Sequence, residues 1–169
     1  MQSWRRGVAG NRSKQQRRSA GFDGRPAQVI LPDVNVLLYA FRTDSQDHLL
    51  YRAWLNDVVN ADAAFGMSPQ VLSGVIRVAT HPRIYARPSG LSDLMAFAAA
   101  LMDQPHCQVV QPGDRHWSIF SALCRQAKAT GNLVQDAWFA ALAIESGCEW
   151  ITTDRDFERF EGLRWRSPL

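Results

Sequence analysis

The stretch VILPDVNVLLYAF, residues 29–41, joins two apolar runs through a proline, a carboxylate and an amide. Residues 28–31 are β-rich and are expected to form a buried strand, and residues 34–41 are expected to leave that strand as a helical turn. Asp33 and Asn35 therefore fall where the strand ends. In open parallel sheets, ligands bind beyond the carboxyl ends of the strands. An Asp at this point can cap a helix, or it can belong to a site if other acids reach the same place.

The rest of the chain continues the alternation of short β-rich runs and longer amphipathic runs. Ser68 and Pro69 are typical of a helix start, Asp114 is expected to cap a helix, and Gly147 is expected to end one. Strands are predicted at 63–67, 107–110, 149–153 and 163–166, and helices at 47–59, 70–80, 91–103, 115–129, 134–147 and 156–160. This alternation predicts an α/β fold of three α/β/α layers, with a mainly parallel central sheet of about five strands.

The charge of the chain is divided unevenly along its length. Residues 1–27 carry seven basic side chains and one acid, whereas residues 28–169 carry 12 basic and 15 acidic side chains. The first segment also lacks apolar periodicity, so we expect a basic, disordered N-terminal extension and one folded domain over 28–169. The extension is interpreted either as an arm attracted to nucleic acid phosphates or as a segment without a role of its own.

Composition restricts the class of protein. No apolar run approaches the roughly 20 residues of a membrane span, and the first residues lack the apolar region of a secretory signal. The three cysteines lack metal-type spacing and are expected to be reduced thiols. These features predict a cytoplasmic globular protein that does not bind membranes.

Several carboxylates are expected at the same edge of the sheet. Asp33 follows the first strand, Asp154 follows the fourth with Asp156 two residues on, and Asp136 is expected in the first turn of a helix that begins near Leu133. Each alone is explained by a turn, a cap or the helix dipole. Together they predict a site for a hard divalent cation, Mg²⁺ or Mn²⁺, with Asn35 and Thr153 orienting the carboxylates or a water. Such an ion activates water for attack on a phosphodiester.

Three stretches, PDVNVLLYA, SPQVLSGVIRVATHPRIY and QDAWFAALAIESGCEWITTDRDFERFEGL, resemble in their order the PIN-domain ribonuclease toxins of the VapC type, most of all the actinobacterial branch. The resemblance covers about residues 29–166. It implies a PIN-like fold and a Mg²⁺-dependent endoribonuclease of a type II toxin-antitoxin system, with tRNA or rRNA among the expected substrates and 5′-phosphate and 3′-hydroxyl ends as products. It also implies a homodimer and a cognate antitoxin of the VapB type.

By motif, the resemblance assigns the catalytic acids Asp33, Asp136, Asp154 and Asp156, the first three of which are expected to hold the metal. The sequence departs from the family at Gly74, where many PIN domains carry a Glu. Weaker metal binding, or a preference for Mn²⁺, is expected from this loss.

Basic side chains near the end of the 70–80 helix are candidates for substrate binding. Arg77, His81 and Arg83 are either contacts for RNA phosphates or parts of a solvated helix end. His116 is expected to be a helix-start residue rather than a general base.

Other functions fit the chain less well. A haloacid dehalogenase-type phosphatase needs a second acid two residues after the first, and this chain has Asn35 there. A receiver domain needs an adjacent acidic pair, which is missing. The remaining alternative is a catalytically weakened PIN-like domain that binds RNA or protein without cutting, and metal-dependent cleavage distinguishes it from an enzyme.

Overall fold

The computed structural model describes residues 28–169, so the predictions for the N-terminal extension lie outside the described residues. In chain order the elements are β1 (Ile30–Pro32), α1 (Val34–Phe41), α2 (His48–Asn60), β2 (Phe65–Met67), α3 (Pro69–Ala79), α4 (Leu91–Met102), β3 (Cys107–Val109), α5 (His116–Ala127), α6 (Asn132–Ser146), β4 (Glu149–Ile151), the 3₁₀ helix η1 (Arg155–Arg159) and β5 (Trp165–Arg166). None of the helices in this range is long and apolar enough to cross a membrane.

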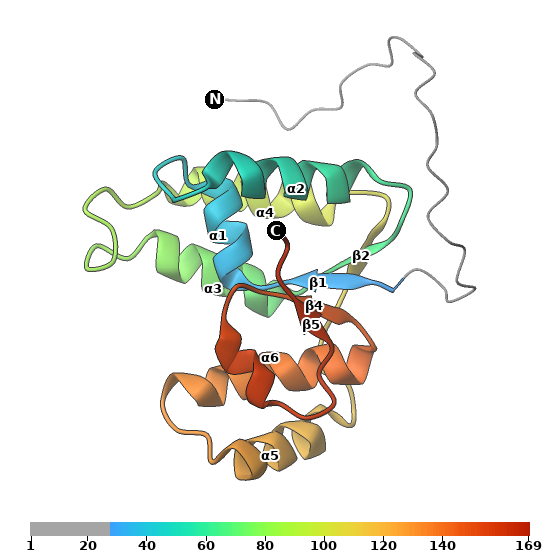
Figure 1. The fold of residues 1–169 in the computed structure, drawn as a ribbon. Helices are drawn as coiled ribbons and strands as arrows, with labels where there is room; N and C mark the ends of the chain where they lie inside the picture. The colour runs from blue at the N-terminus through green and yellow to red at the C-terminus, as the bar shows by residue number, and fades with distance from the viewer. Residues whose placement is uncertain (1–27) are drawn as a thin grey trace.

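The five strands form one parallel sheet in the order β3-β2-β1-β4-β5. From β1 the chain first builds outward through β2 and β3, and it then returns to add β4 and β5 on the other side. The strand order therefore reverses between β1 and β4, which is where open α/β sheets place their ligands. Figure 1 shows α1, η1 and the first turns of α6 on the side to which β1 points.

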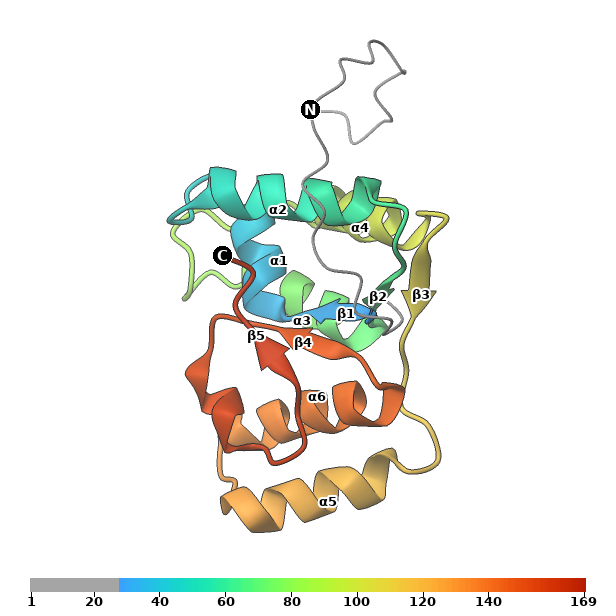
Figure 2. The same cartoon turned by 45° about the vertical axis from the view of Figure 1, so that its right-hand side comes forward.

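Helices cover the sheet on both faces. Figures 1 and 2 show α1, α2 and α4 on one side of the sheet and α5 and α6 on the other, while α3 packs against α1 and α4. The predicted three-layer α/β/α fold with a five-stranded parallel sheet is confirmed.

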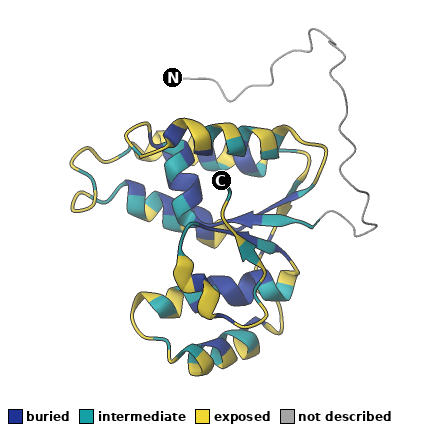
Figure 3. Ribbon diagram, viewed as in Figure 1, coloured by how far each residue is buried: buried dark blue, intermediate teal, exposed yellow. Residues whose placement is uncertain are grey.

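The core lies between these layers, as the buried residues in Figure 3 show. Trp150 of β4 is fully buried, and its ring packs between Phe139 of α6 (5.5 Å between centroids) and Phe157 of η1 (5.4 Å). Burial of large aromatic side chains contributes strongly to stability. Because β4 and η1 flank Asp154, this packing also fixes the backbone that carries one of the candidate acids.

Most predicted helix ends are present, and one is not. The hydroxyl of Ser68 accepts from the backbone N–H of Gln70 (3.3 Å), and Gly147 ends α6 with φ +70°, as predicted. The prediction that Asp114 caps α5 is wrong. That helix begins at His116, and the carboxylate of Glu145 from α6 instead accepts the N–H groups of Gly113 and Arg115, both at 2.8 Å.

Candidate active site

Asp33 connects the end of β1 to the start of α1. Its extended backbone makes it the N-cap of α1, where Oδ1 accepts from the N–H of Val34 (2.6 Å). Its Oδ2 accepts from the hydroxyl of Thr152 (2.6 Å), and its side chain is buried. Capping therefore occupies one carboxylate oxygen, and a threonine after the neighbouring strand holds the other.

Thr152 joins the ends of the two central strands. Besides donating to Asp33, its hydroxyl oxygen accepts from the backbone N–H of Asp154 (3.0 Å) and from the amide of Asn35 (3.3 Å). The sequence predicts Thr153 for this supporting role, but the structure brings Thr152 to Asp33 instead. The reason is the register: Pro32 pairs with Ile151, so the residues that follow these two face one another.

Asp136 lies in the second turn of α6 and is half-buried. The prediction that it lies in the first turn is wrong, because α6 begins at Asn132 and its first turn contains no acid. Favourable interaction with the helix dipole is confined to the terminal turn. Helix stabilisation therefore does not explain an acid at this position.

Asp154 and Asp156 follow β4 in the segment that forms η1. Oδ1 of Asp154 accepts from the N–H of Asp156 (2.9 Å), so Asp154 caps η1. The cap of this short helix is thus Asp154. Asp156 is exposed, and one of its oxygens lies 4.0 Å from the guanidinium of Arg159.

The acids interact electrostatically. Burial raises the pKa of Asp33 from 3.8 to about 7; hydrogen bonds from Thr152 and Val34 oppose this rise, and the charges of Asp136 and Asp154 add to it. Burial, followed by the charges of Asp154 and Asp156, raises the pKa of Asp136 to about 6. Four carboxylates from three separate segments therefore interact, and without a cation Asp33 and Asp136 ionise at a higher pH than an ordinary aspartate does.

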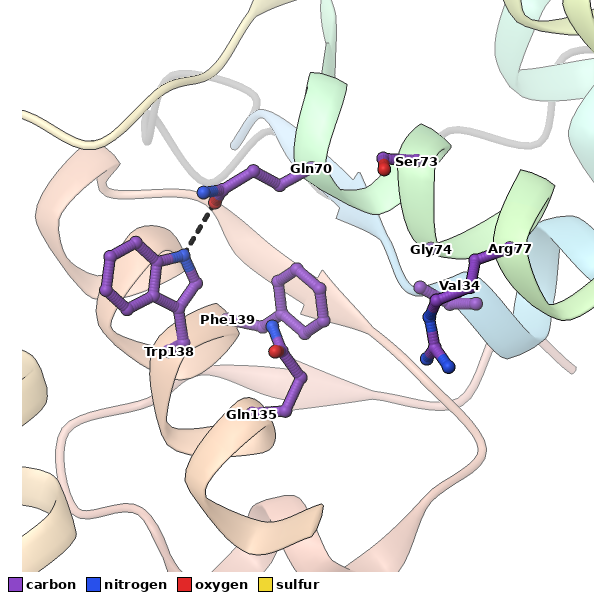
Figure 4. Close-up of a pocket in the computed structure, with 8 residues that line it drawn as sticks. All are labelled: Val34, Gln70, Ser73, Gly74, Arg77, Gln135, Trp138 and Phe139. Carbon is purple, nitrogen blue, oxygen red and sulfur yellow. Dashed lines mark hydrogen bonds between the residues drawn. The ribbon is translucent and has the colours of Figure 1, made fainter.

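A pocket of about 300 Å³ lies between α3 and α6, and its lining includes Val34 and Gln135, the chain neighbours of Asp33 and Asp136 (Figure 4). It is lined by Val34, Gln70, Ser73, Gly74, Arg77, Gln135, Trp138 and Phe139. Of the three basic residues proposed to bind substrate, Arg77 lines this pocket. His81 and Arg83 lie in the turn after α3, where Nδ1 of His81 accepts from the N–H of Arg83 (3.1 Å).

His116 and Gln70 both contact Trp138, one of the residues that line the pocket. His116 is buried at the first position of α5, and one of its ring nitrogens bonds to the carbonyl of Trp138 (3.0 Å), so its predicted helix-start position is confirmed. The indole N–H of Trp138 donates to the side-chain oxygen of Gln70 (2.6 Å). The sequence places Trp138 on an amphipathic helix but does not indicate that it lines this pocket.

A family model for the PIN domain matches residues 30–163. The chain belongs to the PIN-domain family. This PIN domain is 42% identical over 141 residues to ribonuclease VapC43 of Mycobacterium tuberculosis, which covers 83% of the chain and 96% of the relative. It is 39% identical to ribonuclease VapC25 of the same species, which covers 83% of the chain and 99% of the relative. The prediction of a VapC-type endoribonuclease is therefore confirmed.

Solved structures share the fold of this PIN domain. VapBC-1 of nontypeable Haemophilus influenzae aligns with a TM-score of 0.60 at 16% identity, over 83% of this chain and 98% of that one. VapC20 of Mycobacterium tuberculosis, a toxin that cleaves the sarcin-ricin loop, aligns with a TM-score of 0.55 at 17% identity, over 80% and 98%.

Ribonucleases of the PIN family generally use divalent metal ions, and the donor set of this PIN domain fits such an ion. Within residues 28–169, no group of three or more Asp, Glu, His or Cys side chains is arranged so that it alone could hold a metal ion. The acids are hard oxygen donors, and Oδ1 of Asn35 is buried without a hydrogen-bond partner in the described part of the chain. Such an open, oxygen-rich site suits an ion that keeps several of its waters.

Gly74 lies in α3 where the resemblance leads one to expect a Glu. A Cβ atom built on Gly74 lies 2.8 Å from Cγ2 of Val34. An acid at this position would therefore force Val34 to move, and the packing of α3 on α1 favours glycine here. In this PIN domain, the space that such a side chain would enter belongs to the pocket.

Proposed function

We propose that this PIN domain hydrolyses RNA phosphodiester bonds at the carboxylates of Asp33, Asp136 and Asp154, with Mg²⁺ as its metal ion and Mn²⁺ as a substitute. The observation that carries the proposal is that Asp136 and Asp154, which come from separate segments, lie near enough to Asp33 for their charges to add to burial, the main cause, in raising its pKa. Asp33 and Asp154 follow β1 and β4, between which the strand order reverses. Acids that lie close together destabilise a fold unless a cation neutralises them. Mg²⁺ bound at such a site can also bind the phosphate groups of a substrate.

The residues of the chain have separate tasks in this mechanism. A bound divalent ion would neutralise phosphate charge and acidify water. Asp33, held at both oxygens by Val34 and Thr152, provides the most rigid ligand. Asp136 and Asp154 complete the set. Asn35 bonds to Thr152 and thereby keeps its unpartnered oxygen at the same edge.

Asp156 has a secondary task in the proposal. Its charge contributes to the raised pKa of Asp136, so it strengthens the negative potential that attracts the cation. Its exposure leaves it free to act through water rather than by direct ligation.

The partners follow from the family. Solved neighbours of this fold include toxin–antitoxin complexes, and we propose a VapB-type antitoxin that covers the acids. We also propose a homodimer, which agrees with large apolar side chains left exposed on α2 and α4, including Leu49 and Leu91. The cysteines of residues 28–169 are free thiols, in agreement with a cytoplasmic location.

Cleavage of a pool of folded cellular RNAs tests the proposal. The purified full chain is incubated with Mg²⁺, with Mn²⁺ or with EDTA, beside the variants Asp33→Asn and Asp57→Asn. Asp57 is an exposed acid on α2 and serves as the matched control. We expect discrete cuts that need the cation, disappear in Asp33→Asn and persist in Asp57→Asn.

Two outcomes would contradict the proposal. If Asp33→Asn cuts RNA at the rate of the parent, Asp33 does not belong to the catalytic site. Cutting that does not need a cation would contradict the metal mechanism. No cutting under any condition would contradict the enzymatic function and favour a binding module. End-mapping of the fragments then identifies the RNA and tests the expected 5′-phosphate ends.

A further inference from the structure

The pocket between α3 and α6 has two chemically different ends. Figure 4 shows Gln70 and Trp138 joined by their hydrogen bond at one end and the guanidinium of Arg77 at the other. The half-buried indole ring and Phe139 make the first end flat and apolar. Arg77 has an exposed side chain without an ion-pair partner in residues 28–169, so its charge is available to a ligand. The pocket therefore offers an aromatic stacking surface at one end and a positive charge at the other.

The volume of the pocket limits what it can hold. About 300 Å³ is at the low end of the range for small-molecule sites, roughly 300–1,000 Å³. This space suits one nucleobase and excludes a base pair. Unstacked bases of single-stranded RNA are commonly bound on aromatic side chains, while Arg contacts the neighbouring phosphate.

The position of the pocket connects it to the acids. Val34, which lines the pocket, directly follows Asp33, and Gln135, which also lines it, directly precedes Asp136. A nucleotide in the pocket would therefore place its phosphate close to these two carboxylates. A Cβ atom at Gly74 would approach Cγ2 of Val34 to 2.8 Å, so any larger residue there would displace Val34, which lines the pocket beside Asp33.

The hydrogen bond to Trp138 fixes the orientation of Gln70. An indole N–H can only donate, so the atom of Gln70 that faces it at 2.6 Å is the oxygen. The NH₂ group of Gln70 then remains as a donor for a ligand. A fixed donor at the base end favours base edges rich in carbonyl oxygens, as in uracil, over adenine.

We propose that this pocket binds a single unpaired nucleotide next to the scissile phosphate and that it determines base preference. Trp138 stacks on the base, and the NH₂ group of Gln70 selects a carbonyl-bearing edge. The exposed amide of Gln135 offers a further donor and acceptor to the base. Arg77 binds the adjoining phosphate. The inference rests on the proposed ribonuclease function, and its test is a binding measurement that needs no cleavage.

The test measures binding of fluorescein-labelled octauridylate and octaadenylate by anisotropy, with the full chain in the Asp33→Asn background and in EDTA. We expect octauridylate to bind about fivefold more tightly than octaadenylate, which corresponds to one hydrogen bond of about 1 kcal/mol. We also expect a base-paired hairpin to compete poorly for the pocket.

Two variants separate the roles of the base end and the cation end. Gln70→Glu keeps an acceptor for the indole of Trp138 but removes the donor, so the ratio of the two affinities should fall close to one. Arg77→Ala should leave the ratio unchanged and reduce the slope of log affinity against log salt by about 0.7, the value for one phosphate contact in a single strand. Arg125→Ala, an exposed arginine on α5, and Gln46→Ala, an exposed glutamine before α2, are the matched controls.

The outcomes distinguish this inference from the proposed function. Equal binding of the two oligonucleotides by the parent, or an unchanged ratio in Gln70→Glu, would overturn the base-selecting role. An unchanged salt slope in Arg77→Ala would overturn the phosphate contact. Failure to bind either oligonucleotide would overturn the inference and would favour a protein segment as the occupant of the pocket. The cleavage experiment tests the ribonuclease mechanism independently of this result.

Discussion

Thr152 is the residue that holds the site together, although it carries no charge. Its hydroxyl donates to Asp33 and accepts from the N–H of Asp154 and the amide of Asn35. A single oxygen thus connects β1, α1 and the segment after β4. Because the residue is fully buried, none of these partners can exchange Thr152 for water without local opening.

Replacing Thr152 with valine should expose the importance of this oxygen. Thr152→Val keeps the shape but leaves three polar groups without their partner, so we expect the free energy of unfolding to fall by about 2–4 kcal/mol. The pKa of Asp33 should rise further, because the lost hydrogen bond is one of the interactions that lower it. Chemical unfolding and the pH profile of cleavage measure the two effects. Thr153→Val is the control, and an equal loss in that variant would contradict the assignment to Thr152.

The residues of the site could be predicted from sequence only in part. Asp33 and Asp154 each follow a β-rich run, so their arrival at one edge of a parallel sheet follows from topology alone. Choosing Thr152 over Thr153 requires the register of β1 with β4, and the pairing of Pro32 with Ile151 arises from tertiary packing. The same limit applies to Asp136, because the local sequence does not fix whether α6 begins at Asn132 or later.

At the scale of elements, the start of α5 depends on another helix. The carboxylate of Glu145 on α6 accepts from the N–H groups of Gly113 and Arg115 and so caps the turn that leads into α5. A Cβ atom on Gly113 would lie 2.8 Å from Glu145 Oε1, so a larger residue there would displace this flexible carboxylate from the two N–H groups that it accepts from. Local sequence offers Asp114 as a cap, and the tertiary contact replaces it.

Two substitutions compare the tertiary cap with the local one. We expect Glu145→Ala to lower the free energy of unfolding by about 1 kcal/mol, the usual contribution of a helix cap. Asp114→Ala should change it by less than about 0.5 kcal/mol, as is usual at exposed surface positions. Urea unfolding followed by tryptophan fluorescence measures both variants. A larger effect of Asp114→Ala would show that the cap is local after all.

Element types were predictable more reliably than their ends. Amphipathic periods indicated the six α-helices of residues 28–169, and glycine, proline and serine marked several of their limits. The exceptions are ends fixed by distant groups. Glu145 reaches the start of α5 from 30 residues away, which a pattern of neighbouring residues does not contain.

At the scale of the whole molecule, the folded domain and the expected RNA substrate are both negatively charged. Residues 28–169 carry a net charge of −3 before any cation binds, and four of their acids interact at one edge of the sheet. RNA is itself anionic, so binding at this edge needs local positive charge. The divalent ion and Arg77 supply it in our proposals, and affinity should therefore depend on both.

The acid cluster also affects stability, and the sign follows from the pKa values. Burial is the main cause that raises the pKa of Asp33 to about 7 and of Asp136 to about 6, whereas both ionise near 3.8 in the unfolded chain. Above pH 3.8 the unfolded chain has lost protons that the folded protein still binds. These two groups therefore lower the stability as pH rises, up to about pH 7, where Asp33 also becomes ionised.

Without divalent ions, we expect the contribution of Asp33 to lower the free energy of unfolding by a few kcal/mol between roughly pH 4 and pH 7, at about 1.4 kcal/mol per pKa unit. Asp44 and Glu145, whose pKa values are lowered, act in the opposite direction, so the informative quantity is the difference between the parent and Asp33→Asn. Urea unfolding across this pH range should give a curve for Asp33→Asn that lies progressively above that of the parent. Adding Mg²⁺ near pH 7.5 should stabilise the parent and leave Asp33→Asn nearly unchanged, because the ion binds the ionised carboxylates of the folded state. Parallel curves for the two proteins would show that burial of Asp33 does not lower the stability as the pH rises. Equal stabilisation of the two proteins by Mg²⁺ would show that Asp33 is not a ligand of the ion.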